Sequence, residues 1–167
     1  HHTPLFDDFI RLLVDGEYTE VNVRDAVDYN GDGLIDLIGT RYGGNELRVL
    51  LNTGARDRNG LPVLTEGPRS TLQHPPNALQ MVDLGGNGRL DMICGGRTLA
   101  DTGTLGHIRG PYYRTYYALY LNKAQPGEMP RFGAPIPITL ADGTALSLEG
   151  NGAFTVCDWD EDGDWDL

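Results

Sequence analysis

The stretch Asp28-Tyr29-Asn30-Gly31-Asp32-Gly33-Leu34-Ile35-Asp36 contains the pattern that decides the fold of this chain. Two later stretches repeat it, DLGGNGRLD at residues 83–91 and DWDEDGDWD at residues 158–166. Asp occupies positions 1 and 9 of every copy, Gly occupies position 6, and oxygen side chains fill most of positions 3 and 5. Alternating oxygen side chains around a sharp glycine turn are typical of a loop that wraps a hard cation. The three copies therefore predict repeated calcium sites.

The residues around the first loop indicate strands rather than helices. An EF-hand closes its loop with Glu at position 12 and lies between two helices, whereas the closing acid here is Asp at position 9. Residues 18–27 are rich in β-forming side chains, and residues 34–38 form an apolar run around Asp36. This order predicts a β-hairpin with a metal at its tip. The alternative is a bare Asp/Asn/Gly turn, although turn chemistry alone does not require an acid at position 9.

The spacing of the copies predicts a propeller. Position 1 recurs after 55 residues (28 to 83) and again after 75 (83 to 158), and repeats of about 40–50 residues with several strands each are typical of propeller blades. Residues 5–14 resemble an amphipathic helix, but their in-phase copy at 131–140 contains Pro135 and Pro137. A helix interior does not tolerate these prolines, so both segments are predicted to be strands.

The predicted fold is therefore all-β, a β-propeller of four-stranded antiparallel blades, with about two complete blades and two partial ones in this chain. Residues 1–2 are interpreted as a tag remnant and residues 3–20 as the last strand of a preceding blade. Residues 21–76 and 77–150 are predicted to be full blades, and 151–167 the start of the next. Because propellers close with typically about four to eight blades, we interpret the chain as a fragment of a propeller of about six to eight blades.

Three stretches resemble a known family. The Asp-x-Asn-x-Asp-Gly-x-x-Asp-Leu-Ile pattern at 28–38, its relative at 158–167 and Leu-Leu-Asn-x-Gly at 50–54 are similar to FG-GAP/VCBS repeats. Integrin α-chain propellers and many secreted bacterial carbohydrate-active proteins share this repeat. The resemblance implies a calcium ion in the loop of each blade, held by the side chains at positions 1, 3, 5 and 9 and the carbonyl at position 7. It implies much less about function, because one fold hosts many activities.

Carried over position by position, the resemblance implies three ligand sets of unequal strength. Position 3 of the second loop is Gly85, which offers no side-chain oxygen. Because affinity follows ligand charge and number, the predicted order is third, first, second. The second loop either completes its shell with water or is only a turn. The implied ligands are Asp28, Asn30, Asp32, Leu34 (carbonyl) and Asp36; Asp83, Asn87, Arg89 (carbonyl) and Asp91; and Asp158, Asp160, Asp162, Asp164 (carbonyl) and Asp166.

Composition agrees with a calcium protein. The formal net charge is −11, and the three loops contain three, two and six acidic residues, so bound calcium would offset much of the repulsion. An acidic chain without a basic cluster argues against nucleic acid and anionic membranes as partners, and no apolar run reaches membrane-spanning length. Millimolar calcium outside cells suits loop sites of this kind, which predicts a secreted or cell-surface protein. Cys94 and Cys157 are predicted to be free thiols, with a bridge between them as the alternative.

The second repeat contains an insertion. Asn122 lies 31 residues after Asp91, whereas the equivalent Asn52 lies 16 residues after Asp36. The extra residues fall within 97–114, on the face opposite the metal loops, and long loops in compact folds are commonly functional. The candidates for catalysis there are His107, Tyr112 and Tyr113, and the candidates for substrate binding are Arg109, Arg114 and Tyr116.

These side chains suit an acidic sugar. Arginine binds a carboxylate through two parallel hydrogen bonds, and tyrosine stacks on a sugar ring while its hydroxyl stays available. Two functions are predicted: a calcium-stabilised extracellular propeller segment that binds a glycan or a protein partner or, as the alternative, part of a polysaccharide lyase that performs β-elimination on a uronate, with residues 107–116 contributing to the active site. Structural packing is the competing interpretation of each side chain, above all of Tyr116, which lies in a predicted strand.

Overall fold

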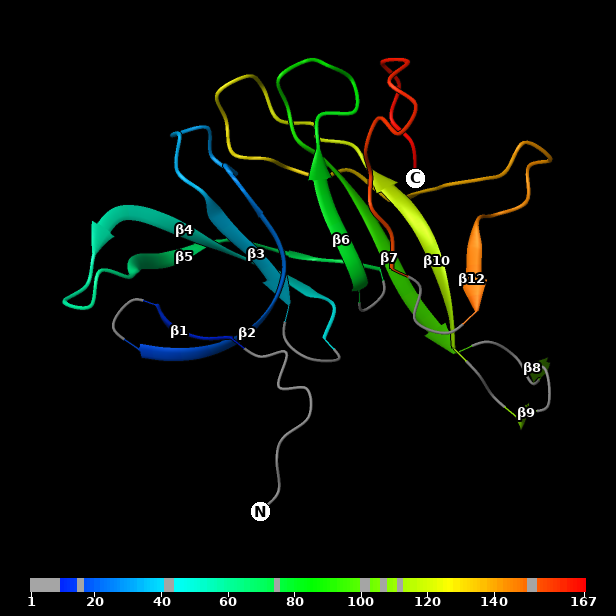
Figure 1. Cartoon of the computed structure of the whole chain (residues 1–167), viewed down its shortest axis with the longest axis horizontal. Helices are drawn as coiled ribbons and strands as arrows, with labels where there is room; N and C mark the ends of the chain where they lie inside the picture. The colour runs from blue at the N-terminus through cyan, green and yellow to red at the C-terminus, as the bar shows by residue number, and fades with distance from the viewer. Residues whose placement is uncertain are drawn as a thin grey trace. The chain divides into compact units, whose positions relative to one another are not determined.

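The computed structural model describes residues 10–14, 17–40, 44–73, 76–99, 103–105, 108–110, 113–149 and 153–167. Within these ranges every regular element is a β-strand and none is a helix (Figure 1). The predicted all-β class is confirmed, and the antiparallel sheets are consistent with a propeller fragment. The chain divides into two compact units, His1–Leu72 and Gln73–Leu167.

The first unit contains a sheet of five strands that closes on itself, and four of these strands pair as the sequence predicts for one blade. Its strands are β1 (Ile10–Val14), β2 (Glu17–Val27), β3 (Asp36–Thr40), β4 (Glu46–Arg56) and β5 (Pro62–Thr71). Strands β2, β3, β4 and β5 pair antiparallel in chain order, as the sequence predicts for one blade. Strand β1 pairs antiparallel with β2, and a parallel pair between Val14 and Leu64 closes the sheet onto β5.

The edge of this blade differs from the expected boundary. Strand β2 begins at Glu17, before the predicted start of the blade at residue 21, and β1 pairs within the same unit. The assignment of residues 3–20 to a preceding blade stays a prediction. Residues 10–14 form a strand and not a helix. For the part of 5–14 that the structure describes, the predicted strand is therefore confirmed.

The blade packs tightly where β2 and β3 pair. Val21, Leu50 and Leu64 form its apolar centre, with Val23 and Leu37 against them. A Cβ added to Gly39 would lie 2.3 Å from Cγ1 of Val21. Because real Cβ contacts are never this short, the sheet depends on a glycine there. The tight pairing fixes the direction in which β2 enters loop 28–36 and β3 leaves it.

The second unit contains a longer and less regular sheet. Its strands run in the order β11-β10-β7-β6, β12 also pairs with β10, and β8 and β9 form a separate two-stranded sheet. Val82, Ile93 and Val156 form its apolar centre. The strand bounds are β6 (Pro76–Val82), β7 (Asp91–Leu99), β8 (Gly103–Leu105), β9 (Ile108–Gly110), β10 (Tyr113–Tyr120), β11 (Ile136–Pro137) and β12 (Ser147–Glu149).

Two predicted segments of this unit need correction. The continuous strand expected at 131–140 is reduced to β11, with isolated bridges at Phe132 and Thr139. Proline has no N–H to donate to a ladder, and the pairing with β10 is limited to Ile136 and Pro137, directly after Pro135. The expected loop 97–114 is also shorter, because β7 continues to Leu99 and β10 begins at Tyr113.

Other predictions can be checked against the described residues. Cys94 is buried and Cys157 half-buried, and neither forms a disulfide, as predicted. Loop 83–91 lies at one end of β7, and the insertion begins at the other end (Figure 1). No described helix is long and apolar enough to cross a membrane.

Candidate metal centre

The first Asp of each loop folds the turn. Oδ1 of Asp28 accepts hydrogen bonds from the N–H groups of Gly31 (2.8 Å) and Asp32 (3.1 Å), and Oδ2 accepts one from Gly33 (2.8 Å). Gly31 and Gly33 have φ of 77° and 84°, values that side chains with a Cβ rarely adopt. Glycine at positions 4 and 6 thus lets the backbone N–H groups converge on one carboxylate.

The other copies use the same contacts. Asp83 accepts from the N–H groups of Asn87 (3.0 Å) and Gly88 (2.6 Å). Asp158 accepts from those of Asp162 (3.0 Å) and Gly163 (3.0 Å). The repeated spacing in the sequence therefore corresponds to one repeated backbone turn.

The last Asp of the loop ties it to the rest of its repeat. Asp36 is fully buried, and its two oxygens accept the N–H groups of Tyr29 (3.0 Å) and Asn52 (2.7 Å). In the second repeat, Oδ1 of Asp91 accepts the N–H of Asn122 at 2.8 Å. This bond explains why a Leu-Asn pair recurs after each of these two loops, as Leu51-Asn52 and Leu121-Asn122. The backbone N–H of its Asn is the donor to the last Asp of the loop.

The residue at position 2 differs between copies, and it is aromatic in the first and third loops. Tyr29 is buried in the first unit, and burial raises its pKa to about 12, so its hydroxyl stays protonated at neutral pH. Trp159 occupies the same position of the third loop and is 83% exposed. Its backbone N–H donates to Oδ2 of Asp166 at 2.8 Å, so the contact between position 2 and position 9 is kept.

The third loop gathers its carboxylates best. Asp158, Asp160 and Asp166 each offer an oxygen, and these oxygens all lie within 4.8 Å of one another, the only such acidic group among the described residues. Calcium–oxygen distances of about 2.3–2.6 Å separate two ligands of one ion by up to about 5 Å. These residues therefore fit a calcium ion. Oδ1 of Asp162 accepts the N–H of Asp164 at 2.9 Å.

The first loop has its ligand residues in order but not gathered to the same degree. Asn30 donates its amide to Oδ2 of Asp32 at 2.9 Å. Oδ1 of Asp32 accepts the N–H of Leu34 at 2.8 Å. A cation in this loop would replace the amide of Asn30 as the partner of Asp32, which is an exchange that exposed side chains make easily.

The third loop is fastened to the second repeat by residues that the sequence did not indicate. The side-chain amide of Gln80 donates to the carbonyl of Val156 (3.1 Å) and accepts from its N–H (2.9 Å). The indole of Trp165 donates to the carbonyl of Asp83 at 3.2 Å. Gln80 is a polar residue in an ordinary strand pattern. Nothing in its sequence context indicates that its side-chain amide binds the backbone of Val156, a contact called the amide clamp below.

The candidates of the insertion are only partly described. His107 and Tyr112 lie outside the described residues, and for Arg109 in β9 and Tyr113 in β10 the structure describes the backbone alone. Arg114 is half-buried in β10, opposite Glu149 of β12 in register. The contribution of residues 107–116 to an active site stays a prediction.

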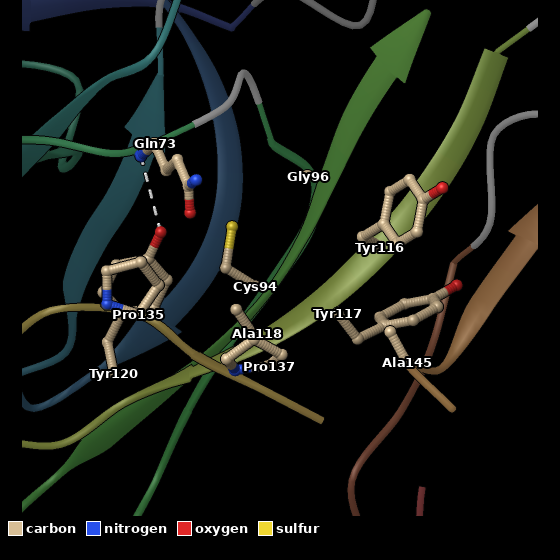
Figure 2. Close-up of a pocket in the computed structure, with 10 residues that line it drawn as sticks. All are labelled: Gln73, Cys94, Gly96, Tyr116, Tyr117, Ala118, Tyr120, Pro135, Pro137 and Ala145. Carbon is tan, nitrogen blue, oxygen red and sulfur yellow. Dashed lines mark hydrogen bonds between the residues drawn. The ribbon is translucent and has the colours of Figure 1, made fainter. Parts of the chain in front are cut away.

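Tyr116 borders a cavity of about 200 Å³ on the second sheet (Figure 2). Tyr116 is 38% exposed, and the hydroxyl oxygen of Tyr120 accepts a hydrogen bond from the backbone N–H of Gln73 at 3.4 Å. Burial raises the pKa of Tyr117 and of Tyr120, so both stay protonated at neutral pH. The sequence did not predict the cavity, whose other lining residues are Cys94, Gly96, Ala118, Pro135, Pro137 and Ala145.

Residues 28–94 match the family model of the FG-GAP-like repeat. The match begins at Asp28, the first position of the first loop, and extends past Asp91, the last position of the second. No curated protein and no solved structure matches the chain. The first two loops and the strands between them are therefore similar to FG-GAP-like repeats, and the sheets of both units are consistent with blades built from such repeats.

Proposed function

We propose that this chain is a calcium-stabilised propeller segment of an extracellular protein that binds a glycan or a protein partner. The observation that carries the calcium part is the gathering of oxygens from Asp158, Asp160 and Asp166 within 4.8 Å. Bound calcium would supply the positive charge that this exposed cluster otherwise lacks. Asp28, Asn30, Asp32 and Asp36 would hold a second ion in the first loop.

The charge of the chain supports the same proposal. The formal net charge is −11, and six acidic residues fall in the nine positions of the third loop. Like charges this close destabilise a compact state unless a cation offsets them. Sites on exposed loops suit the millimolar calcium found outside cells, which supports an extracellular protein.

Terbium luminescence tests the third site directly. Tb³⁺ substitutes for Ca²⁺, and Trp159 and Trp165 lie inside the loop, 83% and 48% exposed. Excitation of tryptophan is therefore expected to produce terbium emission that added calcium displaces. Asp160→Ala should weaken Tb³⁺ binding about tenfold or more, because affinity follows ligand charge and number.

The matched control for this titration is Asp142→Ala. Asp142 is also exposed, and it caps a turn by accepting the N–H of Thr144 at 2.8 Å, remote in sequence from all three loops. Its removal should leave the terbium titration unchanged. Emission that is equally strong in the Asp160→Ala protein would contradict the proposed site.

For the partner we propose a single sugar ring at the cavity beside Tyr116. Ligand pockets for drug-sized molecules measure roughly 300–1,000 Å³, so a cavity of about 200 Å³ suits one ring. The half-exposed phenol of Tyr116 offers a stacking face with a polar end. Pro135 and Pro137 supply apolar walls against the other side of the ring.

Glycan binding is tested with immobilised acidic and neutral polysaccharides. Tyr116→Ala is expected to weaken retention about tenfold, whereas Tyr116→Phe keeps the ring and should retain most of it. Equal retention of all three proteins would exclude this cavity as the sugar site. The same incubations also test the lyase alternative. β-Elimination at a uronate leaves an unsaturated product, so a lyase would produce a new ultraviolet absorbance.

A further inference from the structure

We propose that loop 83–91 takes no calcium, because the side chain of Arg89 engages the Asn87 oxygen that would ligate the metal and places a positive charge beside the loop. The comparison with loops 28–36 and 158–166 rests on the proposed calcium function of those two copies. The geometry of the second loop supports the proposal by itself, through the side chains at positions 3, 5 and 7.

Position 3 has lost its ligand, and its space is occupied. Gly85 stands where the other loops have Asn30 and Asp160. A Cβ added to Gly85 would lie 2.8 Å from Nδ2 of Asn87. The amide nitrogen of Asn87 therefore lies where a side chain at position 3 would begin, and it presents a hydrogen-bond donor and not an oxygen.

Position 5 has its oxygen already engaged. Oδ1 of Asn87 accepts both the backbone N–H of Arg89 (3.1 Å) and its side-chain Nε–H (3.1 Å). A carbonyl oxygen has two lone pairs, so these two donors use both. Because both approaching groups are donors, the oxygen must face Arg89 and the amide nitrogen must face Gly85. Asp32 and Asp162, at the same position, each have a second carboxylate oxygen to offer.

At position 7, the side chain of Arg89 supplies a positive charge. Nη1 of Arg89 donates to the carbonyl of Ala124 at 3.2 Å, so the guanidinium spans from the loop to the chain that follows β10. The loop is bordered by an open hollow of about 510 Å³, where Lys123 adds a second cationic side chain. With only Asp83 and Asp91 as acids, the loop has too little negative charge to attract calcium past two cations.

The first test uses a matched set of substitutions at position 5. Asp32, Asn87 and Asp162 each accept the backbone N–H of the residue at position 7, at 2.8, 3.1 and 2.9 Å. Changing each to Ala therefore removes the same structural bond from each loop. Calcium bound per chain, measured by equilibrium dialysis, should fall by about one ion for Asp32→Ala and for Asp162→Ala and should not change for Asn87→Ala.

A fall of one ion in the Asn87→Ala protein would overturn the proposal.

The second test does not depend on calcium in the other loops. Arg89→Leu should lower the melting temperature by about 3–6 °C to the same extent in calcium and in chelator, because it removes a structural cation and not a metal ligand. Arg131→Leu is the control, since Arg131 is an exposed cation that donates to the carbonyl of Lys123 near the same hollow.

A gain of function is the third test. The combined change Gly85→Asp, Asn87→Asp and Arg89→Leu restores acids at positions 3 and 5 and removes the guanidinium, so the chain should bind about one more calcium ion than wild type.

In the melting test, a melting temperature of Arg89→Leu equal to that of wild type in both buffers, or one that falls in calcium alone, would overturn the proposal. If wild type binds no calcium, the proposed function fails, while the melting test still decides the role of Arg89.

Discussion

Replacing Asp36 with Ala is expected to destabilise the first unit by about 3–5 kcal/mol, even in chelator. The side chain is fully buried, and its oxygens are the acceptors for two backbone N–H groups, those of Tyr29 and Asn52. Alanine leaves both donors without an acceptor, and each unsatisfied buried group costs about 1–3 kcal/mol. Urea unfolding followed by circular dichroism measures the loss, and hydrogen exchange should show reduced protection of these two amides.

Two variants separate this structural role from metal binding. Asp36→Asn keeps one acceptor oxygen and should fall between wild type and Asp36→Ala. Asp32→Asn changes an exposed acid of the same loop and should shift stability in chelator by no more than about 0.5 kcal/mol, as most surface substitutions do. Equal stability of Asp36→Ala and Asp32→Asn in chelator would show that Asp36 matters only as a metal ligand.

The repeated turn could be predicted from the sequence because it is local. Asp28 accepts only N–H groups three to five residues ahead of it, and the glycines supply conformations that few other residues adopt. A pattern of this kind is readable wherever its residues recur at fixed spacing. The bond between Asp36 and Asn52 spans 16 residues. The sequence shows it only indirectly, through a Leu-Asn pair that recurs after each of the first two loops.

The parts that could not be predicted depend on contacts between distant segments. Gln80 and Val156 lie 76 residues apart, and no local pattern links a polar strand residue to a particular backbone group. The cavity beside Tyr116 requires Gln73 and Pro135 to come together with β10. The ladder at 131–140 is shorter than predicted for a different reason, because proline disfavours a strand interior as well as a helix interior.

The second loop shows the limit of counting ligands by position. Its sequence keeps Asp83, Asn87 and Asp91, so position alone leaves open whether it binds calcium with help from water. The structure adds the orientation of Asn87, whose oxygen faces Arg89. Side-chain orientation depends on which donors surround an amide, and spacing in the sequence does not contain that information.

Replacing Gln80 with Ala is expected to destabilise the second unit by about 2–4 kcal/mol and to weaken cation binding by the third loop. The Gln80 amide satisfies both the N–H and the carbonyl of Val156, a residue that is 4% exposed and lies in the apolar centre with Val82 and Ile93. Without the amide, two backbone groups lose their partners. The segment that carries Asp158 to Asp166 then has less to hold it in place, so ordering the loop around a cation costs more free energy.

Tryptophan fluorescence measures this loss selectively, because both tryptophans of the chain, Trp159 and Trp165, lie in the third loop. The matched control is Gln73→Ala: Gln73 is exposed, and the bond to Tyr120 is made by its backbone N–H, which alanine keeps. Gln80→Glu retains the acceptor for the Val156 N–H and loses the donor to its carbonyl, so it should be intermediate. If Gln80→Ala unfolds like Gln73→Ala and binds Tb³⁺ as wild type does, apolar packing of Val156 and Phe154 is enough to hold the third loop, and the amide clamp contributes nothing measurable.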